Sequence, residues 1–374
     1  MKVVLVPSAV DLAGVSTHVL NLASLLHQER MLDLVVCPSD GWLPRTLGDR
    51  GLPHAIVPLS YRPTRFIASS LSLQRFLRSR RSAAIVHVHG RFPMLLAATS
   101  FGHQPLRVAA TVHQFDHPDR KGLLGWKSTL ETSALRRATR ICCVSEDLKA
   151  EILSRIGAEH AGRVDVIPNW IELLWHGRAR PDPRPRPTRG GRPAVRICAV
   201  GRLSREKGFD LLVASVGILT RQGYPVACDI FGEGPEEPAL RRLVAGAGLS
   251  DHVHLEAPSG NLRLRLPEYD ILVIPSRSES FGIVALEAYD ASVPVIASDV
   301  AGLRSTVLQG KTGLLFEPGN SRSLADAITR LACSESLARE LVANARTCLE
   351  RYLPNDRLRE EYREFYTKVI LDNP

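Results

Sequence analysis

Two cationic side chains stand in a short loop framed by glycines. The loop GRLSREKG (201–208) follows the apolar run VRICAVG (195–201) and precedes a helical pattern. Glycine lets the backbone approach a ligand closely, and cations beside a helix N-terminus suit a pyrophosphate. Arg202 and Lys207 are therefore candidates for a diphosphate clamp. A solvated basic loop is the alternative reading of the same residues.

Two glutamates flank the start of a helix in PSRSESFGIVALEA (275–288). A helix that begins near residue 281 or 282 puts Glu279 before it and Glu287 about two turns along it. The backbone N–H groups at the helix start could bind hydroxyl or phosphate oxygens. A carboxylate accepts hydrogen bonds from vicinal sugar hydroxyls, so the pair could hold a ribose and a hexose. The alternative is an ordinary acid at a helix start and a surface glutamate.

Two common nucleotide-binding motifs are absent from these loops. The basic loop lacks the GxxxxGK[ST] pattern of a P-loop, and FGEGPEEP (231–238) lacks the third glycine of GxGxxG. The sequence therefore argues against a P-loop nucleotide hydrolase and against a dinucleotide-dependent dehydrogenase.

The elements that must position these loops are short apolar runs that alternate with helical patterns. The runs are rich in β-branched residues and end at proline, glycine or a polar residue, which is typical of buried parallel strands. They cover 3–7, 34–38, 84–90, 107–113, 140–145 and 163–169, and then 195–201, 226–232, 252–257, 270–276, 294–298 and 312–318. With helical stretches such as 16–28 and 69–79 between them, they predict two doubly wound, Rossmann-like α/β domains that face a cleft.

A segment rich in proline and arginine separates the two series of strands. We predict a first domain at 1–177, a linker at 178–193 and a second domain at 194–354. The charged helical pattern 355–370 could pack back on the first domain.

Composition narrows the class of protein. The chain has 374 residues, a net charge of +9 and 44% hydrophobic residues, which fits a globular protein. No helix-turn-helix, zinc-finger or aromatic RNA-binding motif accompanies the charge, so we expect no nucleic-acid partner. Seven cysteines without a CxxC spacing, no signal peptide and no long apolar run predict a cytoplasmic protein with reduced thiols.

The segment from Arg62 to Arg81 carries arginines and no acidic residue. Four apolar residues fit one stripe of a helix, with arginines beside it: Phe66, Leu73, Phe76 and Leu77. Such a helix could dock on an anionic membrane at the inner face. An ordinary helix packed on its sheet is the alternative.

Several motifs in order resemble the retaining GT-B glycosyltransferases of family 4. In the second half these are VGRLSREKG, FGEGP, PSRSESFGIVALEA with its Glu-x7-Glu spacing, and TGLLFEPG. In the first half PSAVDLAGVSTHVLNLA, IVHVHG, ATVH and VIPNW are similar to the acceptor domain of the same family. The resemblance covers nearly the whole chain.

The resemblance implies a role for particular residues. Arg202 and Lys207 would bind the donor diphosphate and stabilise the charge that grows on it, and Glu279 would contact the donor sugar. His113 would reach the transferred sugar near its anomeric centre. The remaining donor-binding residues would be Gly14, Gly201, Phe281, Gly282, Ile283 and Glu287, and the acceptor contacts would be Asp11 and His18.

The implied reaction is transfer of a hexose from a nucleotide-diphosphate sugar, with a UDP-sugar favoured and GDP-mannose next. The acceptor would belong to a bacterial polysaccharide, a lipopolysaccharide or a lipid-linked glycan, with a small aminocyclitol or a catalytically silent nucleotide-sugar-binding scaffold as alternatives. No cofactor and no metal are expected, since the chain contains no Asp-x-Asp. His87 and His89 lie on one face of a strand, but no Cys, Asp or Glu partner is evident near them in the sequence.

Overall fold

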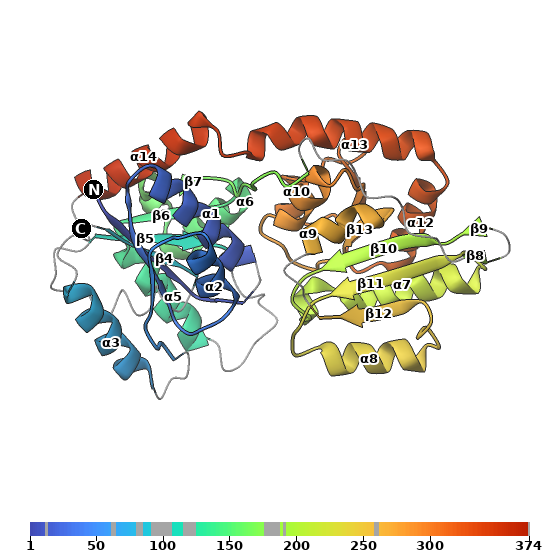
Figure 1. The fold of residues 1–374 in the computed structure, drawn as a ribbon, viewed down its shortest axis with the longest axis horizontal. Coiled ribbons are helices and arrows are strands. Elements are labelled where there is room, and N and C mark those ends of the chain that lie inside the picture. Colours follow the sequence, from blue (N-terminus) through green and yellow to red (C-terminus); the bar gives the residue numbers. More distant parts are fainter. Residues whose placement is uncertain are drawn as a thin grey trace. The chain divides into compact units, whose positions relative to one another are not determined.

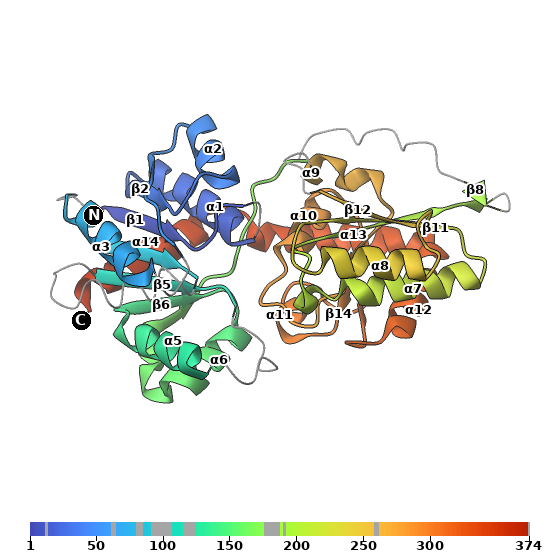
Figure 2. The same ribbon diagram turned by 90° about the horizontal axis from the view of Figure 1, so that it is seen from below.

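The computed structural model forms two compact units. It describes residues 1–11, 14–60, 65–79, 85–90, 107–114, 125–175, 188–189, 192–257 and 262–372. Unit 1 comprises Met1–Trp170 and Pro354–Pro374, and unit 2 comprises Ile171–Leu353. Figures 1 and 2 show the elements of each unit in two views.

A seven-stranded parallel sheet forms the centre of unit 1. Its strand order is β3-β2-β1-β4-β5-β6-β7. All five residues of β1 and of β4 are buried, because helices cover both faces, and this explains why these strands read as apolar runs. The strands are β1 Val3–Pro7, β2 Leu32–Cys37, β3 His54–Ile56, β4 Ile85–His89, β5 Arg107–Val112, β6 Arg140–Cys143 and β7 Val164–Val166.

The helices of unit 1 bury one apolar face each. Two of them begin at capping side chains: Ser145 accepts a hydrogen bond from the Leu148 N–H, and Asn355 accepts one from the Leu358 N–H. None of the helices in the described part of the chain combines the length and the apolarity needed to cross a membrane. The helices are α1 Gly14–Gln28, α2 Trp42–Asp49, α3 Phe66–Arg78, α5 Gly125–Arg137, α6 Glu146–Ile156 and α14 Asp356–Leu371.

The last helix, α14, belongs to the core of unit 1. It lies against β4 and β5 (Figure 1). Its buried residues share a cluster with β1, β2 and α1, and they are Leu358, Tyr362, Phe365, Tyr366 and Val369. Arg359 and Arg363 of α14 also pair with Glu29, which follows α1. The end of the chain therefore completes a core that its beginning starts.

A second parallel sheet, with six strands, forms the centre of unit 2. Its strand order is β12-β11-β10-β13-β14-β15. The strands are β10 Val195–Val200, β11 Val226–Phe231, β12 Val253–Glu256, β13 Ile271–Ile274, β14 Val295–Ser298 and β15 Leu314–Phe316. The helices around it are α7 Phe209–Arg221, α8 Glu237–Gly246, α9 Leu262–Arg265, α10 Ile283–Asp290, α11 Ala301–Arg304, α12 Ser321–Ala332 and α13 Glu335–Leu349.

The prediction of two doubly wound α/β domains is confirmed, and every expected strand is present within a few residues. Strand β3 was not predicted. This strand has only three residues, pairs with β2 alone and exposes His54 and Ile56, so it has no apolar run.

The division between the units differs from the predicted boundary at residue 177. It falls after Trp170, because the backbone N–H groups of Leu174 and Trp175 bind the Asp290 carboxylate at the end of α10. Most of the predicted linker 178–193 lies outside the described residues. Of its remainder, β8 Thr188–Arg189 and β9 Arg192–Pro193 form a two-stranded antiparallel ladder.

Candidate active site

The two loops that carry the candidate functional residues follow neighbouring strands of unit 2. The basic loop follows β10 and the glutamate loop follows β13, and β10 and β13 pair directly. The strand order reverses between these two strands, and ligands of open α/β sheets bind at such a switch point, beyond the carboxyl ends of the strands. The topology therefore brings both predicted motifs to one place.

An ion pair joins the two loops. The Lys207 Nζ lies 2.6 Å from Glu279 Oε2, and the two side chains are 23% and 13% exposed. The Ser276 hydroxyl also donates to this oxygen, at 3.4 Å. A lysine and a carboxylate that are fixed together can present a cation and an acceptor to the same ligand.

Arg277 holds the backbones of the two loops together. Its backbone N–H donates to the Glu206 carbonyl at 2.7 Å, and its guanidinium donates to both Asp210 oxygens at 2.7 and 2.6 Å. The forked guanidinium matches a carboxylate in two parallel bonds, which fixes orientation as well as distance. Sequence reasoning missed Arg277 and Asp210, although an arginine inside the glutamate motif was a signal.

The start of α10 provides backbone donors beside Glu279. The helix begins at Ile283 after Gly282, whose φ of 79° is favourable for glycine. Among the residues that the structure describes, none accepts a hydrogen bond from the N–H groups of residues 281–283. Phe281 itself is buried, and its ring lies 5.7 Å from that of Tyr352.

A second glycine lets another loop reach this site. A Cβ on Gly302 in α11 would lie 2.1 Å from the Glu279 carbonyl oxygen and 2.5 Å from the Ser280 carbonyl carbon. Only glycine fits at this contact, so Gly302 sets how the glutamate loop is supported. This residue was not among those predicted.

Glu287 lies on α10 four residues after its first residue, so it is just over one turn into the helix and not two turns as expected. Its side chain is only 16% exposed, and Arg263 Nε lies 3.8 Å from Glu287 Oε1. Burial raises the pKa of Glu287, although the charge of Arg263 opposes the rise. A carboxylate held in this way is a strong acceptor for a ligand hydroxyl.

The other predicted residues of unit 2 frame the basic loop. Gly201 follows β10 directly, and its N–H donates to the Phe231 carbonyl at 3.0 Å. Arg202 is exposed, and within the described ranges no side chain pairs with its guanidinium. It is therefore free to meet an anion.

Unit 1 has its own switch point, between β1 and β4, and four histidines gather beside it. They come from α1 (His18), β4 (His87 and His89) and the end of β5 (His113). The ring centroids of His18 and His113 are 4.8 Å apart, and those of His18 and His89 are 5.3 Å apart. His18 Nδ1 lies 2.7 Å from Asn169 Oδ1 of the VIPNW motif.

These histidines are held in their neutral form. Burial lowers the pKa of His18 to about 4 and that of His87 to about 3. Burial and neighbouring histidines hold the pKa of His89 and of His113 well below the ordinary value. His87 has a structural role, because its two ring nitrogens lie 2.7 Å from the Tyr366 and Thr111 hydroxyls.

The structure separates the two predicted acceptor residues. Asp11 is exposed in a bend, whereas His18 is 2% exposed inside the histidine group. Gly14 is the first residue of α1, and the residues just before it lie outside the described ranges.

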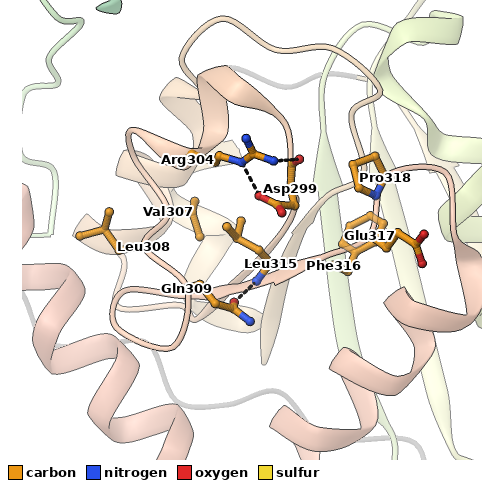
Figure 3. A pocket seen from close by; sticks show the side chains of 9 residues that line it. All are labelled: Asp299, Arg304, Val307, Leu308, Gln309, Leu315, Phe316, Glu317 and Pro318. Atoms are coloured by element: carbon orange, nitrogen blue, oxygen red, sulfur yellow. Dashed lines mark hydrogen bonds and ion pairs between the residues drawn. The ribbon is translucent and has the colours of Figure 1, made fainter. Parts of the chain in front are cut away.

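A shallow hollow in unit 2 lies apart from these residues. It is lined by Asp299, Arg304, Val307, Leu308, Gln309, Leu315, Phe316, Glu317 and Pro318, and none of the predicted site residues lines it (Figure 3). Asp299 and Arg304 neutralise each other there in an ion pair of 2.6 Å. The hollow therefore offers no unbalanced charge to a ligand from this pair.

Two family models match most of the chain. The family described as "Glycosyl transferases group 1" matches residues 192–347, and "Glycosyltransferase Family 4" matches residues 12–173. The chain belongs to this family of GT-B glycosyltransferases.

Curated relatives are similar over part of their length. An exopolysaccharide phosphotransferase of Streptomyces coelicolor is 28% identical over 86% of this chain and 32% of its own length. A D-inositol 3-phosphate glycosyltransferase of Frankia alni is 33% identical over 62% of this chain and 58% of its own. The chain spans only about a third to a half of the length of several of the curated relatives that it matches.

Solved structures share the fold over their whole length. The Anabaena HepE protein in complex with UDP-glucose has a TM-score of 0.82 at 16% identity, and the match covers 98% of this chain and 99% of that one. Sucrose-phosphate synthase from Thermosynechococcus elongatus has a TM-score of 0.80 at 18% identity, with complete coverage of both chains.

Proposed function

We propose that this protein transfers a hexose from a nucleotide-diphosphate sugar to an acceptor hydroxyl with retention of the anomeric configuration. The observation that carries the proposal is the Lys207–Glu279 ion pair at the switch point of unit 2. Around it lie the exposed Arg202, the N–H groups at the start of α10 and the partly buried Glu287. These groups match the parts of a nucleotide sugar: a diphosphate, a hexose and a ribose.

Charge stabilisation is the proposed source of catalysis. As the bond between the anomeric carbon and the phosphate oxygen breaks, negative charge grows on the diphosphate. Opposite charges about 4 Å apart gain roughly 4 kcal/mol at an effective dielectric near 20, so Arg202 and Lys207 can lower the barrier substantially.

The proton balance needs no additional base. The acceptor oxygen bonds to the anomeric carbon on the face that the phosphate leaves, and the departing phosphate oxygen takes the acceptor's proton. The chain contains no Asp-x-Asp, and the two cations supply the charge that a metal would supply to the diphosphate. We therefore propose that transfer is independent of a metal. The family resemblance assigns His113 of unit 1 to the same reaction.

A UDP-sugar is the proposed donor. The HepE structure that shares this fold was solved with UDP-glucose, which supports this choice over GDP-mannose. We propose that Glu287 accepts from the ribose hydroxyls and Glu279 from the hexose hydroxyls, as the family resemblance implies.

A glycan or lipid-linked acceptor is proposed first. A cyclitol acceptor is the second candidate, because several relatives are D-inositol 3-phosphate glycosyltransferases and one is an alpha-D-kanosaminyltransferase of Streptomyces kanamyceticus. Incubation of the protein and a UDP-hexose with inositol phosphates, aminocyclitols and polyprenyl-linked sugars distinguishes the two. Proton NMR of the product then reports whether the anomeric configuration is retained.

Nucleotide binding is the first experiment. Thermal unfolding is recorded with UDP, GDP, ADP and dTDP for the wild type, Arg202→Ala, Lys207→Ala and the control Lys311→Ala, which removes an exposed lysine of the same unit. We expect one nucleotide to raise Tm, and the two clamp variants to weaken its binding on the order of 10- to 100-fold, since each removes a charged hydrogen-bond donor. If no nucleotide raises the wild-type Tm, or if Lys207→Ala behaves like Lys311→Ala, the donor site is wrong.

We also propose that α3 brings the protein to an anionic membrane surface at the inner face. The predicted contact stripe needs correction, since Leu73 and Leu77 are buried in unit 1. Among the described side chains of α3, the large apolar ones that are exposed are Ile67 and Leu71, with exposed fractions of 75% and 47%. Arg62, Arg80 and Arg81 lie outside the described residues.

Vesicle sedimentation tests this surface. Burial of an isoleucine or leucine side chain gains about 1.5–3 kcal/mol, so Ile67→Ser with Leu71→Ser should release the protein from phosphatidylglycerol vesicles. Ile56→Ser, at an exposed isoleucine of β3, is the matched control. The proposal is contradicted if the double variant sediments with the vesicles as much as the Ile56→Ser control does. It is also contradicted if the wild type does not sediment with them.

A further inference from the structure

Three histidines of unit 1 have the arrangement of metal ligands. His18, His89 and His113 can each offer one ring nitrogen, and these nitrogens lie within 4.8 Å of one another. His89 Nδ1 and His113 Nε2 are 3.4 Å apart. Two ligands of one tetrahedral zinc ion, with Zn–N bonds of about 2.0–2.1 Å, are separated by about the same distance.

An unpartnered nitrogen points to a missing ligand. His18 is 2% exposed, and among the residues that the structure describes none forms a hydrogen bond with its Nε2 atom. A buried polar atom is normally paired, because burial without a partner costs free energy. His87 differs, because hydroxyls bind both of its nitrogens. The unsatisfied Nε2 of His18 therefore belongs to a member of the three-histidine group.

The surroundings orient the ligands as in known metal sites. Asn169 Oδ1 accepts from His18 Nδ1 at 2.7 Å, which leaves the lone pair of His18 on Nε2. A metal-bound histidine commonly donates its other N–H to such an acceptor.

We propose that His18, His89 and His113 bind one divalent transition-metal ion of the zinc class. Imidazole nitrogens favour zinc, cobalt, nickel and copper over magnesium and calcium. Three histidines leave a fourth position for water or another small ligand. The three histidines belong to unit 1, whereas the residues of the diphosphate clamp belong to unit 2.

An ion at this site would bind His113, the residue that the family resemblance assigns to the transferred sugar. Metal occupancy and transfer would then compete, and this consequence rests on the proposed function. Metal uptake itself does not rest on it.

Cobalt titration tests the site. Protein without an affinity tag is titrated with Co²⁺ in the absence of nucleotide, and visible absorbance reports tetrahedral coordination. We expect one Co²⁺ per chain, displaced by Zn²⁺ and not by Mg²⁺. His113→Ala and His89→Gln should each weaken binding at least about 100-fold, and Asn169→Ala about 10- to 100-fold, as for other residues that orient a ligand.

The control is His27→Ala, which removes an exposed histidine from the same helix as His18 and should bind Co²⁺ as the wild type does. His113 is only partly buried at a strand end, so His113→Ala keeps the test decisive if His89→Gln does not fold. No Co²⁺ uptake by the wild type, or equal uptake by His113→Ala and His27→Ala, overturns the proposal. Lys207→Ala should still bind Co²⁺, so failure of the donor site and failure of the metal site are distinguishable.

Discussion

At the scale of single residues, Glu287 combines two opposed demands. A ribose-binding carboxylate must be accessible to a ligand, yet this side chain is only 16% exposed and Arg263 lies 3.8 Å away. Asp290 adds a negative charge nearby, and burial raises the pKa of Glu287. Ionised Glu287 therefore lowers the free energy of unfolding. Ligand hydroxyls that donate hydrogen bonds to the carboxylate can offset this loss when they bind.

This cost gives a prediction about stability and pH. Because the folded-state pKa of Glu287 is raised, its protonated form contributes stability at low pH, and this contribution is lost as the pH rises through the folded pKa. We expect Glu287→Gln to have a higher Tm than the wild type at pH 7, with a difference that shrinks toward pH 4. The same variant should bind UDP more weakly.

Thermal unfolding at several pH values, with and without UDP, measures both effects. Glu340→Gln, at an exposed position on α13, is the control and should change neither. A lower Tm for Glu287→Gln at pH 7 would mean that the pairing with Arg263 outweighs the cost of burial.

At the scale of elements, loops that follow neighbouring strands support one another. Arg277 of the glutamate loop forms hydrogen bonds with Glu206 and Asp210, in and just after the basic loop. Gly302 of α11 packs against the backbone of Glu279. The precision of the site therefore depends on residues that would not touch the ligand.

Gly302→Ala is predicted to disturb the site more than the fold. A Cβ would lie 2.1 Å from the Glu279 carbonyl oxygen, so the glutamate loop must move. We expect the free energy of unfolding to fall by roughly 1–3 kcal/mol. The affinity for UDP should fall by a larger fraction of its wild-type value than the free energy of unfolding does. Denaturant unfolding and nucleotide titration measure the two.

Gly246→Ala in α8 is the matched control, since a Cβ there meets no atom within 4 Å and alanine favours a helix. Its unfolding free energy should stay the same or rise. Unchanged UDP binding by Gly302→Ala would show that α11 does not support the glutamate loop.

At the scale of the whole molecule, each unit has its own core and the chain returns to unit 1 at its end. Phe365 and Tyr366 of α14 are buried against β4 and β5, and Tyr366 binds His87 through its hydroxyl. The core of unit 1 therefore cannot be complete before α14 is made.

Phe365→Ala is predicted to destabilise unit 1 alone. Loss of a buried phenylalanine costs about 3–5 kcal/mol, which is a large part of the stability of an ordinary domain. Calorimetry should show a lower transition for unit 1, and UDP should still stabilise the transition of unit 2. Arg357→Ala on the exposed face of α14 should change neither, and a loss of UDP stabilisation in Phe365→Ala would contradict the independence of the two units.

The sequence by itself determined the strands and the loops of unit 2. Apolar runs, prolines and glycines act within a few residues, so VRICAVG and DILVI are recognisable as buried strands without knowledge of their neighbours. Arg202, Lys207 and Glu279 follow these strands directly, and their place at the carboxyl edge of the sheet was predictable from the pattern alone.

Only the tertiary structure decided which distant residues meet. His18, His89 and His113 come together because β4 lies between β1 and β5, and the order of strands is a non-local property. The runs VHVH and ATVH were a signal that two histidines end neighbouring strands, but nothing local placed His18 or Asn169 beside them. The boundary after Trp170 depends likewise on Asp290, and Gly302 on a backbone contact with Glu279. Such contacts depend on packing between segments far apart in the chain, which local propensities do not encode.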